Sequence, residues 1–400
     1  MSNALEDVIV LDLTRDFSTS LSAAFLADFG GRVIRLEFLT AVDQADHQLA
    51  PTKGTWDFEA DLIHRNKQSV ALDPATDKGR ELLVELTAKA DVLVTDWMMA
   101  ELAALSLDYA SVSRINPEII YGRSSGFGPK GPDKDLPAID ELASARTGMM
   151  PILGQPGEPP VYTGAGAMHN SVMLAFGVVT ALIHRQATGE GQEVDTSLFA
   201  ANMYGASLDI QAFLAIGEGD RFIHPISRLD VSNPMSGSLY PSKDGRWVTL
   251  TMPDTDRWWP GLAQALGIDP EDDRFNTHDK RCEENRLELI HLFEERFQTQ
   301  PGSHWRQVFD EKQMSADVIE QFDYPANDPQ ALTNRYIMEL DHPSFGKVKS
   351  LGFPIFMSDS PARLQSLAPC KGQHSGQVLH DLLGYSEDAI NQLTSDGVIA

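Results

Sequence analysis

The sequence predicts an α/β protein with a Rossmann-like large domain, built on a mostly parallel sheet, and a smaller α+β domain. Short β-branched runs alternate with longer helical patterns in the first half of the chain. This alternation is typical of parallel strands covered by helices on both faces. A length of 400 residues exceeds one ordinary hydrophobic core. The composition also changes near residue 220, so we expect two lobes.

The predicted elements follow in a regular order. Strands are expected at residues 8–13, 33–37, 69–73, 92–96 and 119–124, and helices at 20–29 and 77–89. A further helix is expected to start near residue 170, with Asn170 or Ser171 as its cap, and to stop at Gly189. Its apolar residues surround it almost completely, which predicts burial on most faces.

The second half of the chain is less regular. A long helix over 199–216 precedes strands at 238–240 and 247–251, which the turn residues Asp244 and Gly245 join as a hairpin, and a helix over 286–297. We therefore expect a large domain over residues 1–200, a helical linker over 201–224, a small domain over 225–325, and a segment over 326–400 that returns to the large domain.

Composition excludes several classes of function. The net charge is −26, from 32 basic and 58 acidic side chains, whereas nucleic-acid binding requires clustered Lys and Arg. No run of about 18 apolar residues predicts a membrane span, and no signal-peptide pattern is seen, so we expect a cytoplasmic enzyme. Cys282 and Cys370 do not have the spacing of a zinc site, and no metal site is expected.

The glycine-rich turn before the helix near residue 170 predicts an anion site. Free backbone N–H groups and the positive end of the helix dipole meet there, and a carboxylate placed at this point would be stabilised in its charged form. The residue that stands there is Ala167. The loop after the first strand lacks the G-x-G-x-x-G pattern, so a dinucleotide site of the usual kind is not expected.

A second motif suggests a different enzyme class. Residues 122–126 spell G-x-S-x-G after a predicted strand, which is the pattern around the nucleophile of serine hydrolases, here Ser124. That motif requires a helix directly after the serine, whereas Pro129 and Pro132 follow. A serine hydrolase is therefore kept as a remote alternative.

The turn, the apolar helix ending in Ala-Leu-x-x-Arg, and the Thr-Gly-x-Gly-Gln that follows resemble the core of the class III coenzyme A transferases, the family of formyl-CoA transferase and the carnitine CoA-transferases. The resemblance extends in order from residues 8–14 through 26–30, 65–73, 90–94, 115–117 and 125–128 to 341–343 and 372–374. Nearly the whole chain is covered. The resemblance implies an interlocked homodimer.

The resemblance also implies the site residues. In that family the nucleophilic aspartate lies 18 residues before the arginine that ends the helix, and counting back from Arg185 gives Ala167. A functional acid lies near the nucleophile, at Asp140. Ile139 replaces the histidine of the related racemases, which argues against racemisation. The implied coenzyme contacts are Arg15, Phe17, Ser18, Arg65, Asn66, Lys67, Asp96, Trp97 and Met98.

The implied reaction moves coenzyme A from an acyl-CoA to a small carboxylic acid through an aspartyl-CoA thioester, with no permanently bound cofactor. Alanine has no nucleophile. Either the chain is an inactivated variant of one with Asp at 167, or it is naturally a non-catalytic CoA-binding partner subunit. We favour the first account, because the surrounding motifs are kept, and we expect the chain as written to be inactive.

Overall fold

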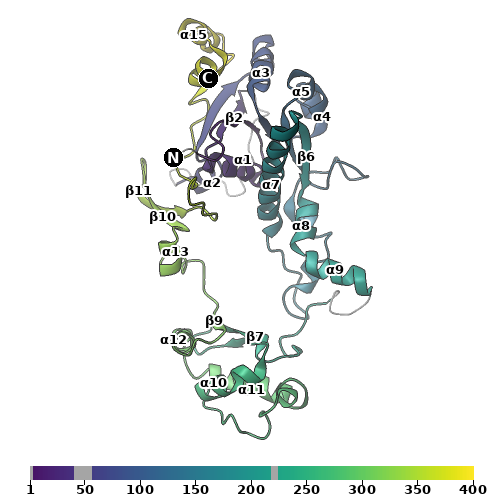
Figure 1. Ribbon diagram of the computed structural model, residues 1–400, viewed down its shortest axis with the longest axis vertical. Coiled ribbons are helices and arrows are strands. Elements are labelled where there is room, and N and C mark those ends of the chain that lie inside the picture. Colours follow the sequence, from purple (N-terminus) through teal and green to yellow (C-terminus); the bar gives the residue numbers. More distant parts are fainter. Residues whose placement is uncertain (1–2, 40–55, 218–223) are drawn as a thin grey trace. The chain divides into compact units, whose positions relative to one another are not determined.

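The computed structural model describes residues 3–39, 56–217 and 224–400. The chain divides into two compact units (Figure 1). The large unit contains residues 1–150, 162–217 and 330–400, and the small unit contains residues 151–161 and 218–329. Neither unit is one continuous stretch of sequence.

The large unit is built on a six-stranded, wholly parallel sheet. Its strand order is β3-β2-β1-β4-β5-β6, with β1 and β4 adjacent at the centre. The strands are β1 Ile9–Leu13, β2 Arg32–Phe38, β3 Lys67–Leu72, β4 Val92–Thr95, β5 Ile120–Ser125 and β6 Gln192–Ser197. This order confirms the Rossmann-like prediction. It also makes the carboxyl ends of β1 and β4 the point where the winding of the sheet reverses, where ligands of such folds bind.

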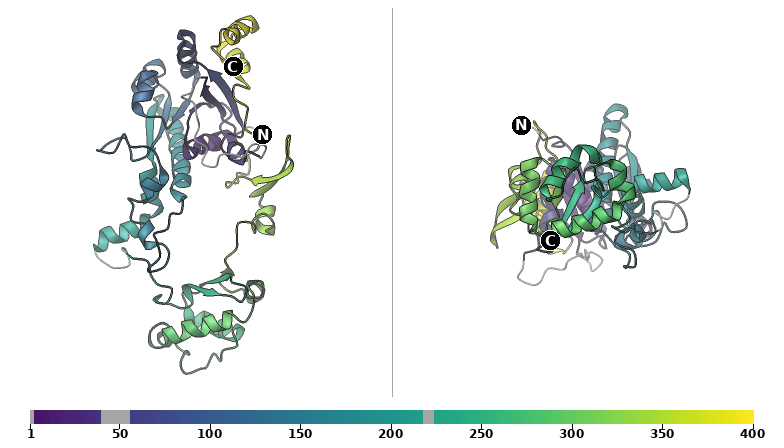
Figure 2. Two further views of the ribbon diagram at one scale, coloured as in Figure 1. Left: turned by 180° about the vertical axis from the view of Figure 1, so that it is seen from behind. Right: turned by 90° about the horizontal axis from the view of Figure 1, so that it is seen from below.

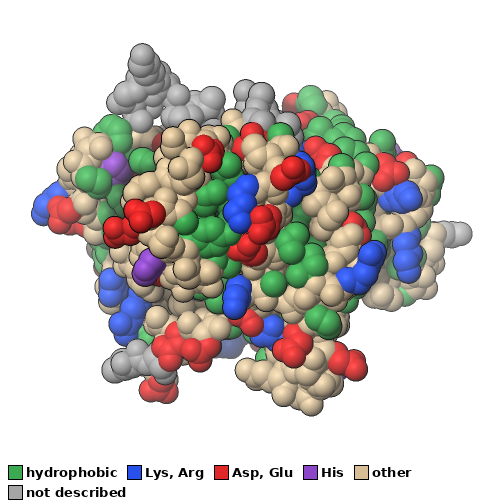
Figure 3. Space-filling view, turned by 90° about the horizontal axis from the view of Figure 1, so that it is seen from above, with side chains coloured by type: hydrophobic (Ala, Val, Ile, Leu, Met, Phe, Trp, Pro, Cys, Tyr) green, Lys and Arg blue, Asp and Glu red, His purple; other side chains and the backbone are tan. Residues whose placement is uncertain are grey.

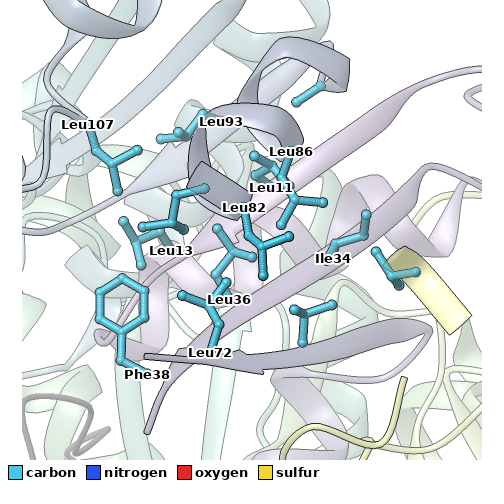
Figure 4. Packing of buried hydrophobic residues seen from close by; sticks show 14 of the residues in the cluster. Leu11, Leu13, Ile34, Leu36, Phe38, Leu72, Leu82, Leu86, Leu93 and Leu107 are labelled. Carbon is cyan, nitrogen blue, oxygen red and sulfur yellow. The ribbon is translucent and has the colours of Figure 1, made fainter. Parts of the chain in front are cut away.

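Helices cover both faces of this sheet because successive strand residues point to opposite sides. Val10 packs in one apolar cluster with α1 and α7, whereas Leu11 packs in another with α3, α4, α5 and α14. Figure 4 shows Leu11 and Leu13 facing Leu82 and Leu86 of α3. These helices are α1 Phe17–Asp28, α3 Asp77–Lys89, α4 Met99–Ala104, α5 Tyr109–Ile115, α7 Ala165–Thr188 and α14 Ser375–Leu383.

The C-terminal segment completes the large unit. It holds the antiparallel pair β10 Ile337–His342 and β11 Gly346–Leu351, and then α14 and α15 Glu387–Ser395. The last residues lie beside β3, where Asp73 N–H donates to the Val398 carbonyl at 2.8 Å and Leu72 bridges Ile399. The remaining helices of this unit are α2 Phe58–Ile63, α6 Asp140–Ser144, α8 Leu198–Gly205 and α9 Ser207–Ile216, and a short 3₁₀ turn, Met150–Ile152, lies where the chain passes to the small unit.

The small unit has its own core. Strands β7 Ser236–Pro241, β8 Trp247–Thr251 and β9 Ala316–Val318 form an antiparallel sheet, and Gly245 makes the hairpin turn with φ of 80°. The helices α10 Thr255–Ala265, α11 Arg286–Phe297 and α12 Gly302–Lys312 pack on it through an aromatic cluster that includes Tyr240 and Phe293 (green in Figure 2). A single π-helical turn spans Lys280–Glu284 and α13 spans Pro329–Thr333, the latter at the boundary with the large unit.

The helix α7 differs from its prediction in two ways. It begins at Ala165, capped by Gly164 in the left-handed conformation with φ of 68°, so Asn170 and Ser171 lie inside it and do not cap it. It is also only half buried: Val172, Phe176 and Ile183 form an exposed apolar stripe, with Phe176 73% exposed. The prediction of burial on most faces was wrong because only the face with Leu174 and Val178 packs on the sheet, and the apolar stripe lies outside that contact.

Two other features concern surfaces. The helix expected over 199–216 is broken at Ala206 into α8 and α9, and no residue of α9 is buried. Within the described ranges, α7 is long and apolar enough to span a membrane by length and composition, yet it packs on the sheet as a core helix. On the face shown in Figure 3, acidic and basic side chains lie interspersed among apolar ones.

Candidate active site

Three helices of the large unit meet at the first turn of α7. The methyl group of Ala167 packs against Ala143 of α6 and Leu198 of α8, and Ala167 is 6% exposed. The rings of Phe127 and Phe199 lie against the same cluster. The anion site expected at this turn is therefore lined on one side by apolar groups.

Asp140 lies at this junction and has two neutral donors. Its carboxylate accepts from the Tyr162 hydroxyl and from the Asn202 side-chain amide, each at 2.7 Å. Burial, and then the hydrogen bond to Asp140, raise the pKa of Tyr162, so this phenol stays protonated and donating at neutral pH. Asp140 is the first residue of α6 and directly follows Ile139.

Gly166 explains how Asp140 comes so close to α7. A Cβ atom added at Gly166 would lie 2.3 Å from Asp140 Oδ1 and 2.0 Å from Asn202 Nδ2. A side chain there would therefore displace both groups, and the glycine allows them to touch the helix backbone. Asp140 and residue 167, which lie 27 positions apart in the sequence, are brought to the same turn.

The loop after β1 is fixed by Asp96, at the end of β4. The backbone N–H groups of Arg15 and Asp16 donate to the Asp96 carboxylate at 2.9 and 2.7 Å. Burial first, and then the nearby Asp16, raise the pKa of Asp96 to about 7. The Asp16 side chain in turn accepts from Ser18 and Thr19 N–H and caps α1. Asp96 therefore holds the loop at the point where the sheet winding reverses.

Arg15 covers one face of Trp97, an expected coenzyme contact whose ring could otherwise stack on the adenine of coenzyme A. Its guanidinium carbon lies 3.4 Å from the centroid of Trp97, which is 3% exposed and packs edge-on against Phe38. Arg15 also pairs with Glu101 at 2.9 Å. Adenine could reach this ring only if Arg15 moved. Met98, by contrast, is half exposed.

The three residues from 65 to 67 are held by internal bonds. Arg65 pairs with Asp28 at 2.7 Å, and Lys67 pairs with Asp12 at 2.6 Å, with all four side chains buried. Burial lowers the pKa of Lys67, while Asp12 opposes that shift. Both cations are thus paired with carboxylates inside the unit, and their role as coenzyme contacts stays a prediction.

Asn66 anchors the returning C-terminal segment. It adopts φ of 60°, and its side-chain oxygen accepts from Gln365 and Ser366 N–H at 2.6 and 3.1 Å. Its amide donates to Asp28 and to the Arg363 carbonyl. No local pattern predicts this role, because the partners of Asn66 in the returning segment lie about 300 positions away.

Asn170 links the expected coenzyme loop to β5. Its amide donates to Ser18 Oγ at 3.1 Å and to Ser124 Oγ at 2.8 Å, and its own Oδ1 is buried without a partner. Phe17, the first residue of α1, is partly buried and packs beside Leu21. Sequence reasoning missed this bridge because it assigned Asn170 to the helix cap.

Arg123 adds a buried cation near the carboxyl end of β5. It pairs with Asp195 on β6 at 2.9 Å, while its Nε has no partner. Burial raises the pKa of Asp195 to about 6, although Arg123 acts in the opposite direction. A cavity of about 40 Å³ lies here, lined by residues that include Asp96, Arg123 and Lys134.

Ser124 is not arranged as a hydrolase nucleophile. It lies buried within β5, and its hydroxyl accepts from Asn170. The segment after it is a loop until α6 begins at residue 140. Within the described part of the chain, no hydrogen bond joins Ser124 to a histidine, and no group of three or more His, Cys, Asp and Glu side chains forms a metal cluster.

Comparison with known proteins identifies the family. A family model described as CoA-transferase family III matches residues 5–375. The chain belongs to CoA-transferase family III. It is 28% identical over 405 residues to cinnamoyl-CoA:phenyllactate CoA-transferase of Clostridium sporogenes, covering 99% of this chain and 97% of that protein. It is 30% identical over 405 residues to succinyl-CoA:glutarate CoA-transferase of Homo sapiens, covering 99% and 90%.

The fold of this CoA-transferase family III chain is also that of a solved relative. The crystal structure of a CAIB/BAIF family protein from Brucella suis matches it with a TM-score of 0.82 at 26% identity, covering 96% of this chain and 100% of that one. The resemblance and the fold class predicted from the sequence are thus confirmed. Enzymes of this family use CoA thioesters as substrates, as the names of the relatives indicate.

Proposed function

We propose that this CoA-transferase moves coenzyme A between an acyl-CoA and a small carboxylic acid through an aspartyl-CoA thioester, with residue 167 as the nucleophile position and with no permanently bound cofactor. The observation that carries the proposal is the junction at the first turn of α7, where residue 167 and Asp140 meet. Unpaired N–H groups and the dipole of a 24-residue helix favour negative charge at this turn.

The alanine at 167 has a direct chemical consequence. A carboxylate would attack the thioester carbonyl and give an anhydride about as activated as the thioester that it replaces. A methyl group cannot do so. We propose that no CoA thioester forms at residue 167 of the chain as it stands, and that Asp at this position would permit one.

The packing around Ala167 favours a second candidate function, a naturally non-catalytic CoA-binding partner subunit. The methyl group contacts Ala143 and Leu198, and Asp140 already places one carboxylate at the turn. A second carboxylate would be buried beside apolar groups and a like charge, which is unfavourable. This environment suits alanine, so it supports a natural residue rather than an inactivating substitution.

The Ala167→Asp variant tests the proposed function. The variant and the native chain would be incubated with succinyl-CoA or cinnamoyl-CoA and a panel of carboxylic acids, with transfer followed by chromatography. We expect Ala167→Asp to gain a mass increase equal to coenzyme A less one water, as a thioester requires, and to transfer the CoA group to an acceptor acid. Ser124→Ala on the same background should still form the adduct at residue 167, whereas a serine hydrolase would lose its nucleophile. Failure of Ala167→Asp to react with any donor would contradict position 167 as the nucleophile position.

A further inference from the structure

We propose that Asp140 carries coenzyme A as a thioester in the chain as it stands, in place of the nucleophile that is missing at residue 167. The inference rests on the proposed function, because it uses the same site, the same acyl-CoA donor and the same carboxylate acceptor. It goes further in assigning the covalent step to a carboxylate from another helix.

The position of Asp140 is the first argument. Its Oδ1 lies where a Cβ atom on Gly166 would stand, so the carboxylate touches the backbone one residue before position 167. Ala143, one turn later on α6, packs directly on Ala167. The α6 helix therefore places the Asp140 carboxylate at the N-terminus of α7, near the free backbone N–H groups of its first turn.

The donors to Asp140 are the second argument. When a thiolate attacks the side-chain carbonyl carbon of an aspartate, negative charge develops on the oxygen that remains. Tyr162 donates to Oδ2 at 2.7 Å, where that charge would form, and Asn202 donates to Oδ1, the oxygen that lies against α7. Both donors are uncharged, so they stabilise the developing charge without an ion pair that would hold the carboxylate inert.

The other buried carboxylates near the ends of the strands are occupied differently. Asp96 accepts from the backbone of Arg15 and Asp16, and Asp195 forms an ion pair with Arg123. Asp96 follows β4 and Asp195 lies in β6, so neither is on the elements that meet at the first turn of α7. Asp140 is therefore the carboxylate at this turn that has neutral partners.

The reaction balances without a co-reactant. An Asp140 oxygen attacks the acyl carbonyl and the C–S bond breaks, giving an aspartyl-acyl anhydride and CoA thiolate. The thiolate then attacks Cγ of Asp140, and the anhydride C–O bond breaks to release the donor acid and leave aspartyl-CoA. The acceptor carboxylate repeats both steps in reverse and restores the Asp140 carboxylate. No net proton is consumed or released.

The test compares the native chain with Asp140→Asn, Glu141→Gln and Ala167→Asp, each incubated with cinnamoyl-CoA or succinyl-CoA. Glu141 is the matched control because it is the neighbouring acid on α6 and is exposed. Intact mass measures the adduct and peptide mapping locates it. We expect an adduct on the Asp140 peptide of the native chain and of Glu141→Gln, and none on Asp140→Asn.

Tyr162→Phe keeps the test independent of folding defects, because Tyr162 is exposed and its ring is retained. We expect adduct formation to slow roughly 100-fold, as for loss of one oxyanion donor. The native chain could carry no CoA adduct while the Ala167→Asp variant carries one at residue 167. This result would overturn the role of Asp140 and leave the proposed function intact. No label on either chain would overturn both, and a native adduct that persists in Asp140→Asn would overturn the assignment alone.

Discussion

At the scale of single residues, Gly166 determines which groups can reach the first turn of α7. Its missing side chain leaves room for Asn202 and Asp140 on the surface of the helix. Any larger residue would force these two groups, and through them α6 and α8, away from position 167. Because Gly166 has no side chain, the polar groups of the candidate site, Asp140 and Asn202, can lie against α7.

We therefore expect Gly166→Ala to damage the site and to destabilise the fold. The added methyl group would overlap the Asp140 carboxylate and the Asn202 amide, and overpacking of this kind costs about 1–3 kcal/mol. Denaturant unfolding measures the stability, and mass spectrometry measures CoA labelling. Ala165→Ser, on the same turn, is the control. Native stability and labelling in Gly166→Ala would contradict the close approach.

Asp96 should make stability depend on pH. The pKa of Asp96 is about 7 in the folded chain against 3.8 for a free aspartate carboxyl, so between these pH values the folded state holds a proton that the unfolded state has lost. Stability conferred by that proton is present at low pH and is lost as pH rises from about 4 to 7. Above pH 7 the contribution is constant.

The Asp96→Asn variant tests this dependence. Denaturant unfolding at pH 5, 6, 7 and 8 should show a shallower decline in the free energy of unfolding than in the native chain. The decline should be reduced rather than abolished, because Asp195, with a pKa of about 6, titrates in the same window. Parallel curves for the two proteins would show that Asp96 ionises normally.

At the scale of elements, the regular part of the large unit was predictable. The predicted helix at 77–89 matches α3, and the predicted strands match β1 to β5 within two residues, because strand periodicity and helix caps are local signals. The start of α7 was missed because a left-handed Gly164 leaves no capping side chain to recognise. The break at Ala206 was missed because apolar residues continue through it.

The candidate site was predictable only in part. Spacing and resemblance pointed to residue 167 and Asp140, which the fold brings together. The environments of Arg65 and Lys67 were not predictable, because their partners Asp28 and Asp12 lie on other elements. The sequence around a single Lys or Arg does not show whether its side chain binds a phosphate or pairs with a buried carboxylate.

The ion pair between Lys67 on β3 and Asp12 on β1 gives a prediction at this scale. Lys67→Met should destabilise the large unit by about 3–5 kcal/mol, because it leaves the Asp12 charge buried without a partner. Lys67→Met combined with Asp12→Leu should recover part of the loss. Thermal and denaturant unfolding of both variants measure this. A double variant no more stable than the single one would contradict the pairing.

At the scale of the whole molecule, exposed apolar residues suggest association. The α7 stripe and α9 expose large side chains, including Phe176, Leu208 and Leu214, and monomeric proteins rarely expose extended apolar patches. We propose that a second copy of the chain covers these helices. The acidic surface opposes close approach of two copies, so the apolar contact must outweigh that repulsion.

Phe176→Glu should therefore shift the protein toward the monomer. A charge in the centre of an apolar contact is desolvated without a partner, which weakens the association by several kcal/mol. Sedimentation velocity across a concentration series measures the effect. Val84→Glu is the control, since Val84 is also an exposed apolar residue but lies on α3, which covers the other face of the sheet. Identical profiles for all three proteins would exclude an interface on α7.

The return of the C-terminus to β3 has a consequence for biosynthesis. The edge strand of the sheet makes its outer backbone contacts with residues 398 to 400, which follow the small unit in the sequence. The large unit therefore cannot make these contacts until the whole small unit has been synthesised. The small unit lies almost wholly within residues 218–329, so its core is assembled from sequence that emerges earlier.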